Sequence, residues 1–493
     1  MNDADDPLRA ARLAKLDRLK ALGIDPYPYA FARTDEAGEL ERRHAGLAAG
    51  AETPERVRVA GRIRAIRNSG MFIDLHDASG KIQVFCHRDF LDPDGLAAVR
   101  LLDIGDVIGV EGLVRRTPRG ELTVNAGAVT ILAKTLRPLP EKYHGLADVE
   151  LRYRQRYLDL IMNAESRDTL RRRSQIVAAL RRHLVERGYL EVETPMLHAI
   201  PGGASAKPFV THHNALDIDL YLRIAPELHL KRLVVGGLAD KVFEINRCFR
   251  NEGLSPRHNP EFTLLELYEA YVDYTAMMRL AEELITGAVE SVLGGLRVGY
   301  GGTEIDLSAP WPRRGMAELV EAATGTDFLA LDNAEDARRA ASALGVPLAG
   351  NENWGQAIEA VFAARVEDTL IAPIHVTGFP RDISPLAKAD RTDPRLAERF
   401  ETYIYGWEVA NAFSELTDPQ DQRARFEAQM QARKAGDEEA QPLDEDYITA
   451  LEYGLPPCGG LGIGIDRLVM LLTDSPSIRD VIAFPTLRPR SPA

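Results

Sequence analysis

The stretch Gly459-Gly-Leu-Gly-Ile-Gly-Ile-Asp-Arg467 places glycine at alternate positions and ends in an acid and an arginine. Alternation of this kind is typical of a strand, and the glycines let another group approach the backbone closely. The apolar run that continues to Leu472 predicts a helix, so the passage reads as a strand that turns directly into a helix. A glycine pattern alone is weak evidence, and its meaning depends on the segments around it.

Two upstream segments also combine a helix or loop pattern with a strand pattern. Arg171–Pro195 predicts a long helix that runs into a strand closed by proline, and Phe249-Arg-Asn-Glu252 leads through a loop to His258-Asn-Pro-Glu-Phe262. Helices and strands mix here without regular βαβ alternation, which favours an antiparallel α+β domain over a doubly wound sheet. The other predicted elements are a helical region over Asp148–Glu186, strands over Lys241–Phe249, Thr263–Ala270 and Glu401–Val409, and a solvated helix over Asp418–Asp446.

The N-terminal part of the chain has the shorter period of β-strands. A helix over Leu8–Leu22 precedes it, and a helix-like segment, Asp92–Leu101, lies before its fourth strand. This order is what an oligonucleotide-binding (OB) barrel requires. The predicted strands are Val57–Ile66, Met71–His76, Lys81–His87, Asp106–Val114 and Leu122–Leu132. We therefore predict a helical extension over residues 1–54, a five-stranded barrel over 55–140 and an α+β domain over 141–493.

Composition excludes several classes of protein. The 493 residues contain three cysteines without CxxC spacing, which argues against a zinc knuckle and fits a reducing compartment. No run of about 18 apolar residues occurs, and Met1–Pro7 has the wrong composition for a secretory signal, so we expect a cytoplasmic protein that does not span a membrane. The net charge is −14, but 13 Lys/Arg against 10 Asp/Glu over residues 55–140 make the predicted barrel slightly basic. That asymmetry suits local binding of a polyanion, although chance also explains it.

In their order and spacing, Arg171–Pro195, Phe249–Phe262 and Gly459–Arg467 resemble motifs 1, 2 and 3 of the class II aminoacyl-tRNA synthetases. The resemblance runs from about residue 8 to Pro489 and is greatest with the bacterial lysyl-tRNA synthetase family. It implies activation of L-lysine with ATP to lysyl-adenylate, release of pyrophosphate, and transfer of lysine to the 3′ end of tRNA(Lys). Four further segments are similar to the lysyl branch: Pro201-Gly-Gly-Ala204, Arg223-Ile-Ala-Pro-Glu-Leu228, Glu266-Leu-Tyr268 and Asn411-Ala-Phe-Ser-Glu415.

The resemblance makes Arg250 and Arg467 the catalytic residues. Adenylate formation brings a carboxylate to a phosphate, so the site must supply positive charge where negative charge builds up. The forked guanidinium of Arg250 would bridge the amino-acid carboxylate and the α-phosphate, and Arg467 would lie over the adenine and touch the γ-phosphate. The implied ATP-binding residues are Arg250, Glu252, His258, Asn259, Phe262, Glu401, Glu408 and Arg467.

The resemblance also implies a lysine pocket with two metal ligands beside it. An ε-ammonium that is buried without partners is very costly, so such a pocket needs anions and hydroxyls at its end. Glu401 and Glu408 would bind Mg²⁺, in two or more ions, because carboxylate and phosphate oxygens are hard ligands. The implied lysine-binding residues are Gly203, Glu227, Arg250, Glu266, Tyr268, Asn411, Phe413 and Glu415, with Tyr268 and Glu415 at the ε-ammonium.

For tRNA, the family resemblance points to the predicted barrel. Phe72 and Gln83 lie on successive predicted strands, and an aromatic platform with a polar neighbour is how such a barrel stacks and reads an unpaired base. The implied anticodon-reading residues are Arg67, Phe72, Gln83 and Glu121. The alternative is that Phe72 belongs to the barrel core, since half of all strand positions point inward.

Other interpretations stay open at this point. The nearest relatives in the class activate aspartate or asparagine, but they bind a carboxylate or amide side chain and would need basic residues where Glu266 and Glu415 stand. A paralogue that attaches lysine to proteins would lack the barrel. A non-catalytic relative would not retain the intact set Arg250, Glu252, Glu401, Glu408 and Arg467. Motif 1 of the class builds a twofold interface, so we expect a homodimer. Three positions and one segment depart from the family pattern without removing a required charge: Lys207, His229, Ala412 and Phe379-Pro-Arg-Asp382.

Overall fold

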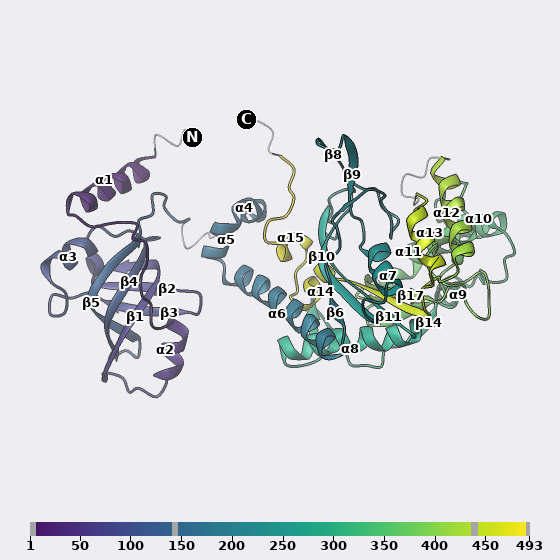
Figure 1. Ribbon diagram of the computed structural model, residues 1–493. Coiled ribbons are helices and arrows are strands. Elements are labelled where there is room, and N and C mark those ends of the chain that lie inside the picture. The colour runs from purple at the N-terminus through teal and green to yellow at the C-terminus, as the bar shows by residue number, and fades with distance from the viewer. Residues whose placement is uncertain (1–5, 141–145, 435–441, 490–493) are drawn as a thin grey trace. The chain divides into compact units, whose positions relative to one another are not determined.

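The computed structural model describes residues 6–140, 146–434 and 442–489 and divides the chain into two compact units, Met1–Gly145 and Leu146–Ala493 (Figure 1). Three predictions fall partly on residues 1–5, 141–145 and 435–441, which lie outside the described residues: the absence of a secretory signal, the boundary after residue 140 and the end of the solvated helix. The helix itself is α12, Pro419–Lys434.

The first unit contains a closed five-stranded barrel in the order β1-β2-β3-β5-β4. All neighbouring strands are antiparallel except β3 and β5, which run parallel. The side chains of Ile73, Leu75, Val84 and Val124 fill the interior. The bounds are β1 Glu52–Arg67, β2 Phe72–His76, β3 Lys81–Phe85, α3 Pro93–Val99, β4 Val107–Arg116 and β5 Leu122–Ala133. The predicted OB barrel, with its helix before the fourth strand, is therefore confirmed.

Two N-terminal helices pack against this barrel. They are α1, Pro7–Ala21, and α2, Ala37–Arg43. Leu19 of α1 and Leu40 of α2 are fully buried in the same core as the strands. The part of the chain that the sequence set apart as a helical extension thus shares the core of the barrel.

The second unit is built around an eight-stranded sheet in the order β14-β15-β16-β17-β18-β11-β10-β6. The six strands from β15 to β10 are antiparallel, and only the pairs at the two edges are parallel. This sheet confirms the predicted α+β class. The bounds are β6 Leu190–Glu191, β10 Lys241–Phe249, β11 Glu261–Ala270, β14 Arg313–Gly315, β15 Ile374–Thr377, β16 Arg399–Ile404, β17 Trp407–Ser414 and β18 Cys458–Gly464.

Helices and smaller strands surround the sheet. The helices are α4 Val149–Arg154, α5 Arg156–Met162, α6 Ala164–Glu186, α7 Glu227–Val235, α8 Tyr274–Leu293, α9 Met316–Thr324, α10 Ala334–Ala343, α11 Trp354–Arg365, α12, α13 Glu445–Glu452, α14 Ile465–Leu472 and α15 Ile478–Val481. The smaller strands are β7 Leu197–His198, β8 Val210–His213 and β9 Ile218–Leu222, which form one sheet, and β12 Arg297–Tyr300 and β13 Thr303–Asp306, which form another. The 3₁₀ turns are η2 Asn68–Gly70, η3 Glu367–Thr369 and η4 Arg381–Ile383.

The predicted elements differ from the observed ones in three places. The helical region Asp148–Glu186 is broken at Gln155 and Asn163 into α4, α5 and α6. The predicted strand Glu401–Val409 is a hairpin that turns at Tyr405 and Gly406, both with positive φ. The strand before Pro195 shrinks to the two residues of β6, which pairs with β10 at the sheet edge. Within the described ranges, no helix is both long and apolar enough to cross a membrane.

Candidate active site

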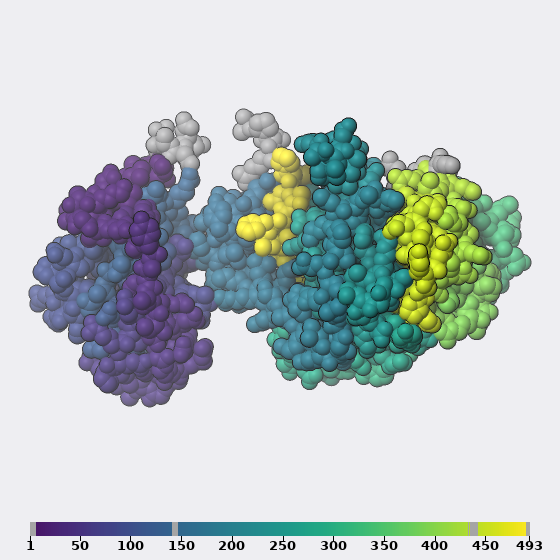
Figure 2. All heavy atoms as spheres, viewed as in Figure 1, coloured from purple at the N-terminus to yellow at the C-terminus, as the bar shows by residue number. Residues whose placement is uncertain are grey.

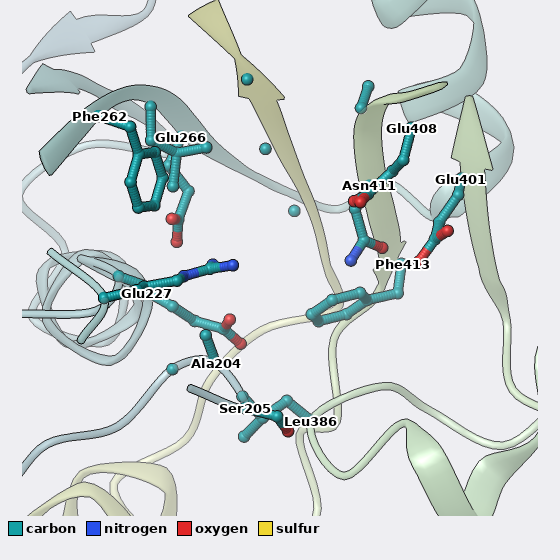
Figure 3. Close-up of a pocket in the computed structure, with 18 of the residues that line it drawn as sticks. Ala204, Ser205, Glu227, Phe262, Glu266, Leu386, Glu401, Glu408, Asn411 and Phe413 are labelled. Carbon is teal, nitrogen blue, oxygen red and sulfur yellow. The ribbon is translucent and has the colours of Figure 1, made fainter. Parts of the chain in front are cut away.

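A cavity of about 620 Å³ opens over the central strands of the large sheet. Figure 3 shows Glu227 and Glu266 on one side of it and Asn411, Glu401 and Glu408 on the other. Every residue that the sequence assigned to ATP, lysine or magnesium lines this cavity: Gly203, Glu227, Arg250, Glu252, His258, Asn259, Phe262, Glu266, Tyr268, Glu401, Glu408, Asn411, Phe413, Glu415 and Arg467.

The glycines of β18 form part of the cavity wall because of their register. Gly460 pairs with Tyr268 on one side and Phe413 on the other, and Gly462 pairs with Glu266 and Asn411. A Cβ at Gly460 would lie 2.0 Å from Oε1 of Glu415. The glycine therefore makes room for this carboxylate.

One end of the cavity is acidic and closed. Glu227, Glu266 and Glu415 are all buried there, and the Tyr268 hydroxyl donates to Oε1 of Glu266 at 2.6 Å. Burial raises the pKa of Glu266 to about 8, with the Glu227 carboxylate acting in the same direction, and burial likewise raises the pKa of Glu415. Oε1 of Glu415 has no hydrogen-bond partner among the described residues. A buried acceptor without a partner is costly, so this oxygen is suited to a cationic ligand.

The entrance to this acidic end is shaped by Gly203. Its φ is +88°, and a Cβ there would lie 3.0 Å from the Cβ of Glu227. Only glycine fits both the left-handed conformation and the close approach. The backbone can therefore lie directly beside the Glu227 side chain.

The other end of the cavity is basic. The Arg250 guanidinium lies 5.1 Å from the centre of the Phe262 ring, and its Nε has no hydrogen-bond partner within the described ranges. Arg467 donates to the backbone oxygen of Glu408 at 2.8 Å and to its Oε2 at 3.1 Å, and it lies 3.3 Å from Nε2 of His258. Glu252 is exposed at the mouth. This end presents two guanidinium groups and an aromatic face, which suits a nucleotide triphosphate.

Arg173 of α6 forms hydrogen bonds to residues of both β11 and α14. It donates to Oδ1 of Asp466 at 2.6 Å and to the Thr263 hydroxyl at 2.9 Å, while Oδ2 of Asp466 accepts from the Thr263 amide at 2.6 Å. Asp466 is buried and immediately precedes Arg467. The orientation of Arg467 therefore depends on a side chain from a distant helix.

Glu401 and Glu408 lie on adjacent strands β16 and β17. Burial, reinforced by the Glu408 carboxylate, raises the pKa of Glu401 to about 7. Glu401 also accepts hydrogen bonds from Arg399 at 2.5 Å and from Tyr403 at 2.7 Å. Two carboxylates that repel each other beside a triphosphate-sized cavity fit Mg²⁺, which takes one or two carboxylates together with phosphate oxygens and waters. No cluster of three or more protein ligands for a metal occurs among the described residues.

Two of the predicted anticodon residues, Phe72 of β2 and Gln83 of β3, share the outer face of the barrel. Phe72 pairs with Phe85 and is half-buried, with ring centroids 5.1 Å apart, whereas its neighbour Ile73 points into the core. The structure thus excludes the alternative that Phe72 is a core residue. Gln83 lies on the same face and accepts from the Thr123 hydroxyl at 3.2 Å.

The other two predicted anticodon residues are held by ion pairs. Arg67 donates two hydrogen bonds, at 2.8 and 3.0 Å, to Asp74, which pairs with Gln83 across the strands. Glu121 lies 3.4 Å from Lys81. Arg115 covers the Phe85 ring at 4.6 Å, so the face combines aromatic and basic groups.

Comparison with known proteins agrees with this geometry. A family model described as class II tRNA synthetases (D, K and N) matches residues 148–488, and one described as an OB-fold nucleic acid binding domain matches residues 57–132. The lysine–tRNA ligase of Carboxydothermus hydrogenoformans is 56% identical over 97% of each chain, and that of Rhizobium meliloti is 54% identical over 97% of this chain and 96% of its own. The lysine–tRNA ligase of Moorella thermoacetica is 54% identical over 99% of both chains. This chain belongs to the lysine–tRNA ligase family of class II tRNA synthetases.

Several residues of this lysine–tRNA ligase site were not singled out from the sequence. Arg173, Asp466 and Arg399 position other site residues through hydrogen bonds, and Arg399 also donates to Oδ1 of Asn411 at 3.2 Å. Lys231 is fully buried, with its ammonium 2.6 Å from Oε1 of Glu227 and in contact with Oε2 of Glu415. Because Glu227 and Lys231 stand four apart on α7, their spacing is typical of an exposed helix pair, and only the structure reveals that both are buried.

Proposed function

We propose that this chain forms lysyl-adenylate from L-lysine and ATP, releases pyrophosphate, and transfers lysine to the 3′ end of tRNA(Lys). The observation that carries the proposal is the closed acidic end of the cavity, where three buried glutamates meet the Tyr268 hydroxyl and one carboxylate oxygen of Glu415 lacks a partner. An ε-ammonium placed there gains charge-assisted hydrogen bonds in a site that excludes water.

The basic end of the cavity supplies the chemistry. Arg250 holds the substrate carboxylate and the α-phosphate together, so that two anions meet without repulsion. Phe262 supports the Arg250 guanidinium at 5.1 Å and stacks on the adenine with Arg467 on the opposite face. Glu252 accepts from the adenine amino group, and His258 and Asn259 contact the phosphates. Asn411, whose carbonyl oxygen is engaged by Arg399, directs its amide toward the substrate carboxylate.

Glu401 and Glu408 would hold Mg²⁺, in two or more ions, against the triphosphate. When bound, the metal neutralises phosphate charge and favours departure of pyrophosphate. Glu408 also orients Arg467 through its backbone and side-chain oxygens. The two glutamates therefore link the metal site to the arginine over the adenine.

The acidic end also accounts for the choice of amino acid. Glu227 and the backbone of Gly203 receive the α-ammonium, and Phe413 borders the aliphatic part of the side chain. Glu266, Tyr268 and Glu415 receive the ε-ammonium. Aspartate would place its carboxylate among buried anions, and asparagine would leave them without a counter-ion, so both are rejected at considerable energetic cost.

The barrel reads the anticodon. Phe72 stacks on an unpaired base, Gln83 reads its edge, and Arg67 and Glu121 border this face. The half-buried aromatic rings and the basic groups of this face, and its separation from the barrel core, support this role.

We further propose a cytoplasmic homodimer. Several large apolar side chains in motif 1 and in the segment that follows it are exposed in the single chain: Val185, Leu190, Leu197 and Ile200. The β8–β9 hairpin, which projects from its unit in Figures 1 and 2, adds Val210, Leu216 and Ile218. A second copy that covers these residues across a twofold axis would remove them from water.

A charging assay tests the proposal. The purified chain is incubated with ATP, Mg²⁺, tRNA and each labelled amino acid, and label on tRNA is counted with and without prior periodate oxidation of the tRNA 3′ end. Lysine should be attached only to intact tRNA and only with ATP. Attachment of aspartate or asparagine in place of lysine, or none by the folded protein, would overturn the proposal.

A further inference from the structure

The ammonium group of a buried lysine, Lys231, lies behind the acidic wall of the cavity. Lys231 is fully buried and is not part of the lining, yet its Nζ lies 2.6 Å from Oε1 of Glu227 and contacts Oε2 of Glu415. Glu227 and Glu415 come from α7 and from the end of β17, so this ammonium joins two elements far apart in the sequence. Glu227 and Glu415 both line the cavity, and Oε1 of Glu415 has no hydrogen-bond partner among the described residues.

Aromatic rings enclose the same ammonium. Its distances to the ring centres of Phe413, Tyr268 and Tyr447 are 5.5, 5.6 and 6.0 Å. Although burial alone would lower the pKa of Lys231, the carboxylates of Glu227 and Glu415 raise it well above its ordinary value. Lys231 is therefore a permanent cation.

The charges of this region do not balance without a ligand. Glu227, Glu266 and Glu415 supply three carboxylates and Lys231 supplies one ammonium, which leaves two negative charges uncompensated when all are ionised. Arg250 is left to balance the carboxylate of the ligand. The other charged side chains around the cluster are paired with one another: Arg223 with Glu244, Arg399 with Glu401, and Arg232 with Asp444.

We propose that Lys231 is a positioning and specificity-determining residue, whose ammonium ties Glu227 to Glu415 from behind and sets the charge of the pocket so that a ligand with two ammonium groups neutralises it. The inference rests on the proposed function and deepens it. A ligand with one ammonium, such as a neutral or acidic amino acid, leaves a buried negative charge unpaired. A missing Lys231 would leave one even with lysine bound.

The imbalance makes lysine binding release protons. In the empty cavity, burial raises the pKa of Glu266 to about 8, so this carboxyl holds its proton near neutrality. Burial also raises the pKa of Glu415. The arriving ammonium groups favour the ionised carboxylates, so Glu266 gives up its proton. Lysine affinity should therefore increase as the pH rises from 6 toward 8, where the Glu266 carboxyl of the empty cavity ionises without a ligand.

Calorimetry and exchange kinetics on the full chain test the inference together. The calorimetry measures L-lysine binding at pH 7 in two buffers of different ionisation enthalpy, and the difference gives the number of protons released. ATP–pyrophosphate exchange measures KM for lysine and for ATP. The wild type should release about one proton or more per lysine. In Lys231→Met, which approximates the length of the side chain, lysine KM should rise roughly a hundredfold and ATP KM should stay within about twofold.

Two variants control for folding. Lys231→Arg keeps the charge and should recover most of the lysine affinity, whereas Arg232→Met removes a neighbouring cation of α7 that contacts Asp444 and should leave lysine KM near the wild-type value. A wild type without lysine-dependent exchange would refute the proposed function itself. With an active wild type, an unchanged lysine KM in Lys231→Met would overturn the inference. If Lys231→Met does not fold, the proton count of the wild type still tests the inference. A wild type that releases no proton on binding lysine would overturn it.

Discussion

Glu415 lies at the closed end of the cavity, where its Oε2 contacts the Lys231 ammonium. Its Oε1 lies beside Gly460 and has no hydrogen-bond partner among the described residues. Replacing Glu415 with glutamine keeps the shape and removes the charge. The loss of a charged partner in a closed site costs about 2–4 kcal/mol, so lysine KM should rise by about two to three orders of magnitude with ATP KM little changed.

Steady-state exchange kinetics check this prediction, and Glu398→Gln is the matched control. Glu398 is also buried beside the sheet, but it accepts from Ser414 and pairs with Arg391 outside the cavity. A wild-type lysine KM in Glu415→Gln, or an equal loss in the control, would show that Glu415 does not bind the ε-ammonium.

The variant Glu408→Gln tests the proposed metal site. Glu408→Gln should reduce adenylate formation by at least about a hundredfold even at saturating lysine, because it removes a hard ligand and a contact to Arg467 together. Raising the Mg²⁺ concentration should partly restore activity. Exchange rates across a Mg²⁺ titration measure this, with Glu269→Gln, a strand glutamate paired with Lys241, as the control. Unchanged exchange in Glu408→Gln would make this glutamate merely structural.

Strand β18 shapes the cavity because its glycines have no side chains. A Cβ at Gly460 would lie 2.0 Å from Oε1 of Glu415 and 2.6 Å from Cε1 of Tyr268, so Gly460→Ala should displace both groups. Lysine KM should rise about tenfold or more, since the affected contacts are worth at least 1.4 kcal/mol. Exchange kinetics and a melting curve measure the two effects separately. Gly299→Ala on β12, where a Cβ would meet nothing within 4 Å, should behave like the wild type; equal lysine KM in both variants would refute this role of Gly460.

Elements with a strong local period could be predicted from the sequence, and those set by distant contacts could not. The barrel strands and β10, β11 and β18 follow from alternation and glycine placement. The breaks between α4, α5 and α6 depend on tertiary packing: Arg156 at the start of α5 is buried and donates to backbone oxygens of Ala483 and Arg479, more than 300 residues away. No local pattern signals such a contact.

The same distinction applies to the site. Residues inside recognisable motifs, such as Arg250 and Glu415, were predictable and do line one cavity. Lys231 and Arg173 were missed because a lysine or an arginine in a helix usually faces solvent, and only the fold reveals their buried partners. Ala412, a departure from the family pattern, is fully buried in β17, between the site residues Asn411 and Phe413.

We expect the two tasks to be divided between the two units. In the proposed function, adenylate formation uses residues of the second unit alone, whereas charging also needs the proposed anticodon face of the first. Phe72→Ala should therefore leave lysine-dependent exchange near normal and lower kcat/KM for tRNA roughly ten- to a hundredfold, because a base-stacking platform is worth about 1–3 kcal/mol. Gln83→Ala should act in the same direction and relax preference at the central anticodon base.

Exchange, charging and a melting curve measured side by side test this separation. Phe31→Ala, which removes an aromatic ring that packs on Gly109 and Arg58 of the same unit, is the control and should not affect charging. Equal losses of exchange and charging in a well-folded Phe72→Ala variant would contradict the assignment of the anticodon face.

In the proposed function, the buried acidic end of the cavity selects an amino acid with a second ammonium group. ATP–pyrophosphate exchange by the wild-type chain with each of the twenty amino acids measures this most directly, because it needs neither tRNA nor the barrel. Lysine should support exchange, and aspartate and asparagine should fall below it by about three orders of magnitude or more in kcat/KM. Exchange that is supported equally well by aspartate, asparagine or another amino acid without a side-chain ammonium would contradict the account.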